Sequence, residues 1–67
     1  MSSRSLVHTS EDGTETWHLL MKDDGTYWVE HTWPNGSETV SAGVFIGQTE
    51  DALLLRLVRA AITRTIR

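Results

Sequence analysis

The sequence predicts an α+β fold in which a four-stranded antiparallel β-meander is covered on one face by a single C-terminal α-helix. Three observations lead to this prediction. A glycine-containing turn signal recurs in the stretches EDGTETW, DDGTYW and PNGSETV. The segments around these turns are rich in β-branched and aromatic residues and alternate in polarity, as strands do. The last part of the chain combines apolar and basic residues without a glycine or proline, which is typical of a helix.

The length of the chain limits its stability. A chain of 67 residues forms one domain, residues 1–67, and buries only about 60% of its unfolded surface. Small proteins of this size usually add disulfides, a metal ion or a partner subunit. The sequence has no cysteine, so disulfides and thiolate metal sites are excluded.

Each repeated phrase predicts a hairpin turn. Asp-Gly and Asn-Gly favour such turns because glycine accepts a positive φ, which aspartate and asparagine also tolerate. The strands are therefore expected at about residues 4–10, 15–22, 26–33 and 38–46. The helix is expected at about residues 50–65, with Thr49 as its N-cap and acidic residues in its first turn.

Alternation of polarity predicts the register of the second hairpin. A three-residue loop, Asp23 to Gly25, pairs Leu19 with Val29 and places the apolar residues of both strands on one face. A two-residue loop would instead bury the polar face.

The third hairpin needs an even loop, either residues 35–36 alone or residues 34–37. His31 then pairs with Val40, and Val29 pairs with Ala42. In the first strand Leu6 and Val7 are adjacent, so its register stays undecided.

The predicted helix has more apolar surface than one sheet face needs. At 100° per residue its apolar side chains spread over about 240°, whereas packing on a sheet needs about 100°. Because large exposed apolar patches are uncommon on monomers, the spare surface predicts a homodimer with two-fold symmetry. The residues expected at this interface are Leu55, Val58, Ile62 and Ile66.

A second candidate site lies on the outer face of the predicted sheet. Trp28 is expected opposite Leu20 and beside Gly43, with Phe45 on the diagonal. Such a cluster is either an anchor for a protein partner or cross-strand packing that shields the glycine. Both interpretations stay open.

Charge is distributed unevenly along the chain. Residues 11–38 contain seven acidic residues and one lysine, a net charge of −6, and the chain from Ala52 onward contains four arginines and no acid. This asymmetry indicates an anionic partner, complementarity between two copies of the chain, or simply solvated faces. The alternative function is therefore nucleic-acid binding through Arg56, Arg59 and Arg67.

Other functional classes find little support in the sequence. His18 and His31 are expected on opposite faces of the sheet, so they cannot share a metal ion. No nucleophile elbow or phosphate-binding glycine loop is present, and we expect no catalytic residue, cofactor or small-molecule substrate. With no signal peptide or membrane span in the sequence, we expect a small, cytoplasmic, non-catalytic protein-binding domain that self-associates.

Overall fold

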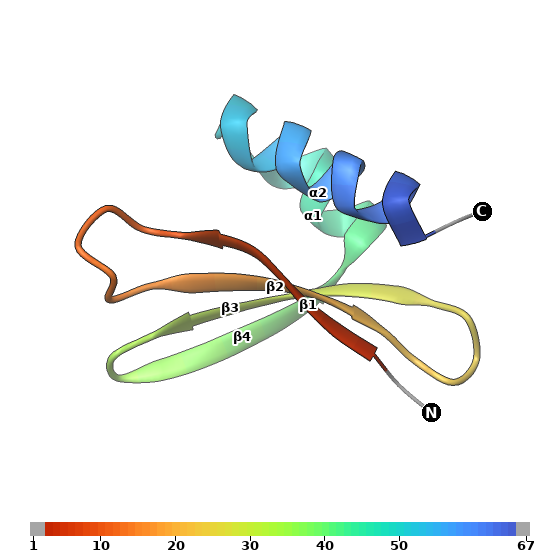
Figure 1. Cartoon of the computed structure of the whole chain (residues 1–67), viewed down its shortest axis with the longest axis horizontal. Helices are drawn as coiled ribbons and strands as arrows, with labels where there is room; N and C mark the ends of the chain where they lie inside the picture. Colours follow the sequence, from red (N-terminus) through yellow and green to blue (C-terminus); the bar gives the residue numbers. More distant parts are fainter. Residues whose placement is uncertain (1–2, 66–67) are drawn as a thin grey trace.

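Four antiparallel strands in chain order form the sheet, and two helices follow and pack on one of its faces (Figure 1). The structure, a computed structural model, describes residues 3–65. The predicted α+β meander is thus confirmed, although two helices cover it instead of one. The elements are β1 (Ser3–Thr9), β2 (Thr16–Met21), β3 (Tyr27–Trp33), β4 (Gly36–Ser41), α1 (Ala42–Gln48) and α2 (Ala52–Thr65).

The turn between β2 and β3 sets the register of the central strands. The backbone N–H of Lys22 donates to the Thr26 carbonyl, and the N–H of Gly25 donates to the Lys22 carbonyl, both at 2.9 Å. Gly25 has a φ of 84°, a conformation that glycine adopts without steric cost. Leu19 consequently pairs with Val29. The prediction of a three-residue loop is confirmed.

The turn between β3 and β4 differs from both predicted loops. Trp33 pairs with Gly36 and Val29 pairs with Val40, so the loop is residues 34–35. The reason is turn chemistry, because proline favours the second position of a four-residue turn and glycine the fourth. The predicted partners of His31 and Val29 on β4 were wrong by two residues. Since side chains alternate with a period of two, Val40 still faces the helices as expected.

A β-bulge in β1 settles the register that the sequence left open. Leu6 pairs with His18, and the next paired residue, His8, pairs with Trp17. The bulge at Val7 lets Leu6 point outward while Val7 packs against the core. It also brings His8 to the side of the sheet that faces the helices.

Helix α1 occupies residues that were expected to continue the fourth strand. The predicted strand 38–46 ends at Ser41, whose hydroxyl accepts a hydrogen bond from the Val44 N–H at 3.2 Å and caps α1. Phe45 and Ile46 then pack against the core. The N-cap and this tertiary packing override the alternating pattern.

Helix α2 begins two residues later than expected. The Asp51 carboxylate accepts hydrogen bonds from the N–H groups of Leu53 at 2.9 Å and Leu54 at 3.2 Å. Asp51 is therefore the N-terminal cap, whereas Thr49 caps the C-terminus of α1, where its N–H bonds to the Phe45 carbonyl.

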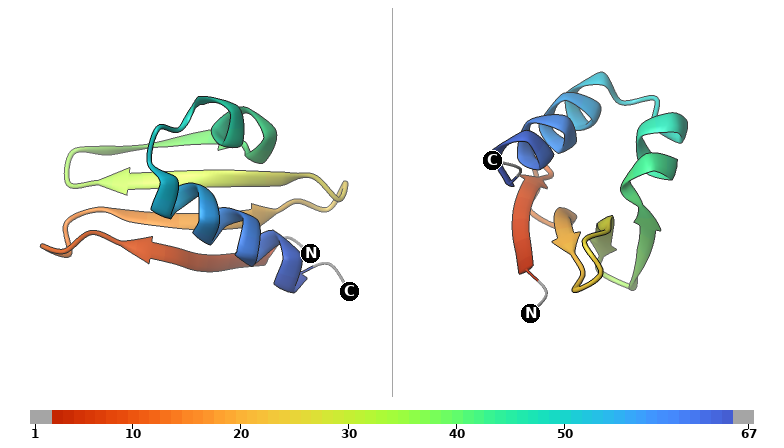
Figure 2. Two further views of the ribbon diagram at one scale, coloured as in Figure 1. Left: turned by 90° about the horizontal axis from the view of Figure 1, so that it is seen from above. Right: turned by 90° about the vertical axis from the view of Figure 1, so that its right-hand side faces the viewer.

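The core lies between the sheet and the two helices. Among the described residues the buried hydrophobic side chains are Leu19, Val29, Ala42, Leu54, Val58 and Ala61. Figure 2 shows α2 crossing over β1 and β2 while α1 lies over β3 and β4. Within residues 3–65, no helix lies on the other face of the sheet.

Candidate protein interface

Of the helix residues expected to form a spare apolar face, one is buried and two are half-buried. Val58 is fully buried, and Ile62 packs against the cluster that contains it. Leu55 is half-buried, and Ile66 lies outside the described residues. The prediction is wrong for Val58, because α1 packs beside α2 and the two helices and the sheet share one core.

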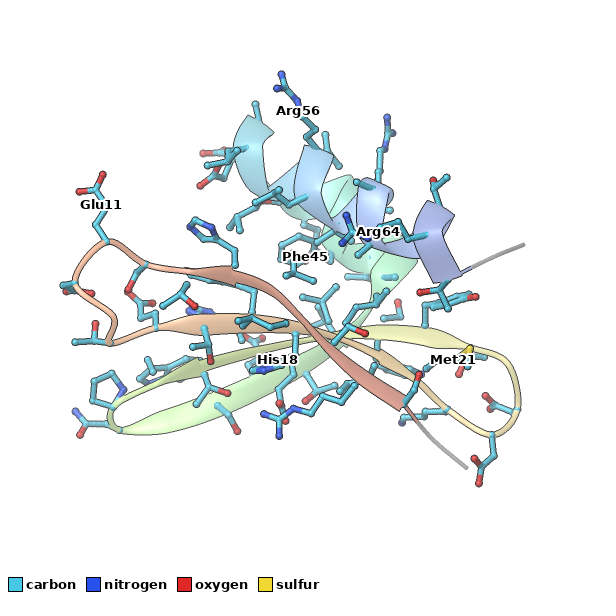
Figure 3. The ribbon with its side chains drawn as sticks, viewed as in Figure 1. Glu11, His18, Met21, Phe45, Arg56 and Arg64 are labelled. Atoms are coloured by element: carbon cyan, nitrogen blue, oxygen red, sulfur yellow. The ribbon has the colours of Figure 1, made fainter. Side chains whose placement is uncertain are left out.

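The outer-face cluster expected around Trp28 is only partly formed. Leu20 pairs with Trp28 as predicted. Phe45, in contrast, lies between α1 and the sheet and packs against the core (Figure 3). Gly43 is a residue of α1 and not of β4. The expected contacts of Trp28 with Phe45 and Gly43 are therefore wrong, because the chain turns into a helix at Ala42.

The Trp28 ring is instead covered by residues from its own hairpin. The Lys22 ammonium nitrogen lies 4.0 Å from the ring centroid, a cation–π distance. The indole N–H donates to the Thr26 hydroxyl at 2.8 Å. Trp28 is half-buried in the single chain, so the structure favours packing over an exposed binding anchor.

The arginines considered for nucleic-acid contact lie on the outward side of α2. Arg56 and Arg59 are exposed, and Arg56 points away from the sheet (Figure 3). Within residues 3–65 neither Arg56, Arg59 nor Arg64 forms an ion pair. Arg67 lies outside the described residues. This part of the helix surface is a free cationic face.

Four rings form a row across three strands, which we call the aromatic row (His8, Trp17, His31 and Trp33). Trp17 and His31 are stacked, with centroids 4.4 Å apart and planes 7° apart. His8 lies 5.4 Å from Trp17, and Trp33 lies 5.1 Å from His31. All four residues are half-buried. Because Trp17 packs against the core, the row lies on the helix-facing side of the sheet.

Acidic side chains accompany the aromatic row. Glu15 Oε1 lies 2.7 Å from His31 Nε2; since a carboxylate only accepts, Nε2 donates in this hydrogen bond. Glu38 pairs with His31 across β3 and β4 and therefore projects to the same side of the sheet. Glu38 is exposed. The aromatic row thus has a carboxylate on each side of His31.

The turn between β1 and β2, which follows His8 and precedes Trp17 in the chain, adds further negative charge near the aromatic row. The Asp12 carboxylate accepts hydrogen bonds from the Ser10 hydroxyl at 2.7 Å and from the Thr14 N–H and hydroxyl at 3.0 and 2.8 Å. These bonds lower the pKa of Asp12 to about 2, because they stabilise the ionised form. Asp12 therefore remains charged at physiological pH. The Glu11 side chain points to the side of the sheet on which the helices lie (Figure 3).

The sequence contained part of the signal for the aromatic row. Alternation already placed Trp17, His31 and Trp33 on one face. The place of His8 depends on the bulge, which the sequence did not predict. The row is covered only in part because a helix of 14 residues spans about 21 Å while the molecule is 33 Å long.

Enclosed or preformed sites are not found in the described part of the chain. Residues 3–65 contain no pocket and no group of three histidine or acidic side chains placed to hold a metal ion. Neither described helix has the length and apolar character that crossing a membrane requires.

The chain was compared with known proteins. No protein-family model, curated protein or solved structure matches it.

Proposed function

We propose that this protein is a small, non-catalytic protein-binding domain that self-associates into a closed dimer. The observation that carries the proposal is the thin core: among residues 3–65, the largest fully buried side chains are two valines, Val29 and Val58. A chain of 67 residues without cysteine usually needs a further source of stability, and a second subunit supplies it.

The exposed surface supports the same proposal. The chain exposes 4708 Å², whereas a folded monomer of 7.5 kDa is expected to expose about 4,200 Å². Three large hydrophobic side chains remain exposed among the described residues, and two of them, Val44 and Leu53, lie on the helices. The proposed contact therefore involves the outward side of the helix layer, including Leu53, and replaces the face centred on Val58.

Measurement of molar mass against concentration tests this proposal. Light scattering or sedimentation equilibrium from about 1 µM to 1 mM, the range in which weak dimers form, should give twice 7.5 kDa at the upper end. Leu53→Glu should shift the mass toward the monomer, because it buries an unpaired charge in the interface. Leu6→Glu, at an exposed residue of β1, is the matched control and should leave the dimer intact. A wild-type mass that stays monomeric throughout would contradict the proposal.

Nucleic-acid binding is the second candidate function. The observation that favours it is the exposed pair Arg56 and Arg59, which lacks acidic partners within residues 3–65. The net charge of −3 opposes it. Anisotropy of a labelled oligonucleotide distinguishes the two functions, since phosphate contacts weaken steeply with added salt.

A further inference from the structure

One end of the sheet extends beyond the helices. Figures 1 and 2 show that the turns between β1 and β2 and between β3 and β4 project past the first turn of α2. The aromatic row lies toward this end, because His8 is near the end of β1, Trp17 near the start of β2, and His31 and Trp33 near the end of β3. In the single chain, the helix layer therefore covers one part of the sheet, and the aromatic row lies beside that layer.

The chemistry of the aromatic row and of the acidic residues around it favours a cationic partner. Residues 10–17 and 31–38 contain no lysine or arginine. Among the acidic residues there, Glu11 and Glu38 are exposed, and Asp12 stays ionised. Indole rings beside carboxylates suit the guanidinium group, which stacks on aromatic faces and forms paired hydrogen bonds with carboxylates.

The chain itself carries the complementary surface. The outward face of α2 presents Arg56 and Arg59 next to the exposed Leu53. No acidic residue occurs between Ala52 and Thr65. The two guanidinium groups have no ion-pair partner in the described part of their own chain.

We propose that two copies pair by reciprocal docking, so that the outward face of α2 of each copy lies on the aromatic row of the other. A two-fold rotation places the helix layer of each chain over the uncovered end of its partner, and both contacts are then identical, as closed symmetry requires. Arg56 and Arg59 pair with Glu38 and Glu11 of the second copy, while Leu53 packs near the Trp33 ring. This pairing rests on the proposed self-association and identifies the surfaces that make it.

A charge-exchange experiment tests the pairing. The helix variant Arg56→Glu/Arg59→Glu and the sheet variant Glu11→Arg/Glu38→Arg should each dissociate, with Kd raised at least about tenfold, because like charges then meet at both contacts. An equimolar mixture of the two variants should form a heterodimer, since opposite charges again face each other at both contacts. Asp23→Arg, at the opposite end of the sheet, is the control and should remain dimeric.

Sedimentation velocity of each variant and of the mixture, with circular dichroism to verify folding, gives the result. Formation of the heterodimer by two variants that are each monomeric supports the pairing and shows that both are folded. A wild-type dimer whose charge variants remain dimeric would overturn the pairing while leaving self-association intact. Folded variants that stay monomeric when mixed would also overturn the pairing. A wild-type chain that is monomeric at about 1 mM would instead overturn the proposed function itself, and the pairing with it.

Discussion

His18 is a residue whose ionisation is linked to folding. It pairs with Glu30 on the outer face of the sheet, and its Nδ1 is buried without a hydrogen-bond partner in the described part of the chain. Burial lowers the pKa of His18 below its usual value, and the nearby Arg4 charge lowers it further, while Glu30 acts in the opposite direction. The Arg4 guanidinium lies 2.8 Å from Glu30 Oε1, so Glu30 is already engaged by a cation.

This environment predicts a pH-dependent loss of stability. Because the pKa of His18 is lower in the folded chain, the unfolded chain binds more protons in the window just below the ordinary histidine pKa of about 6.5. The contribution of His18 is therefore present above that value and is lost as the pH falls from it through the lower pKa of the folded chain. Urea denaturation at about pH 7.5 and 5.5 should show a smaller loss for His18→Gln than for the wild type. Equal losses in the two proteins would show that His18 is not responsible.

Gly25 illustrates what could be predicted at the level of single residues. The glycine needs a positive φ, and the acidic residues before it suit a three-residue loop. The loop length then determined the face of every side chain in β2 and β3, because side chains alternate along a strand. The pairing register of β4 with β3 could not be predicted in the same way. Residues 34–37 allow several loops with an even number of residues, and these loops differ only in which residues of β3 and β4 pair.

Helix α1 shows why one element could not be predicted. Val40, Ala42, Val44 and Ile46 occupy alternate positions, with Ser41 and Gly43 between the first three, as in a half-buried strand. Gly43 and Gly47 also disfavour a helix interior. Over such a short segment, alternation does not distinguish a strand from a helix with one buried side. Packing of Phe45 and Ile46 on the core decides in favour of the helix.

The N-cap of α1 should contribute measurably to stability. Ser41→Ala removes the hydroxyl that accepts from the Val44 N–H and should cost about 1 kcal/mol of unfolding free energy. Ser37→Ala is a suitable control, because Ser37 is exposed on the same strand and should change stability by less than about 0.5 kcal/mol. Urea denaturation of both variants measures the difference. A loss at Ser41 no larger than that at Ser37 would contradict the importance of the cap.

For the whole molecule, the fold class followed from the sequence but the candidate interface did not. The expected interface relied on a single helix with spare apolar surface, and α1 covers part of that surface. The aromatic row depends on the bulge at Val7 and on where α2 ends relative to the sheet. Such features arise from the fit between elements, which the polarity pattern of one element does not contain.

Self-association through this layer should couple folding to concentration. Because only the folded chain forms the dimer, the melting temperature of the protein rises with protein concentration. For a domain of this size we expect a rise of a few degrees Celsius for each roughly tenfold increase. Scanning calorimetry across about two decades of concentration measures it. The variant Arg56→Glu/Arg59→Glu should lose the dependence and melt at the temperature of the dilute wild type, and about 0.5 M salt should reduce the dependence by screening the arginine contacts. Identical melting temperatures for the wild type at every concentration would mean that the thin core around Val29 and Val58 is sufficient by itself.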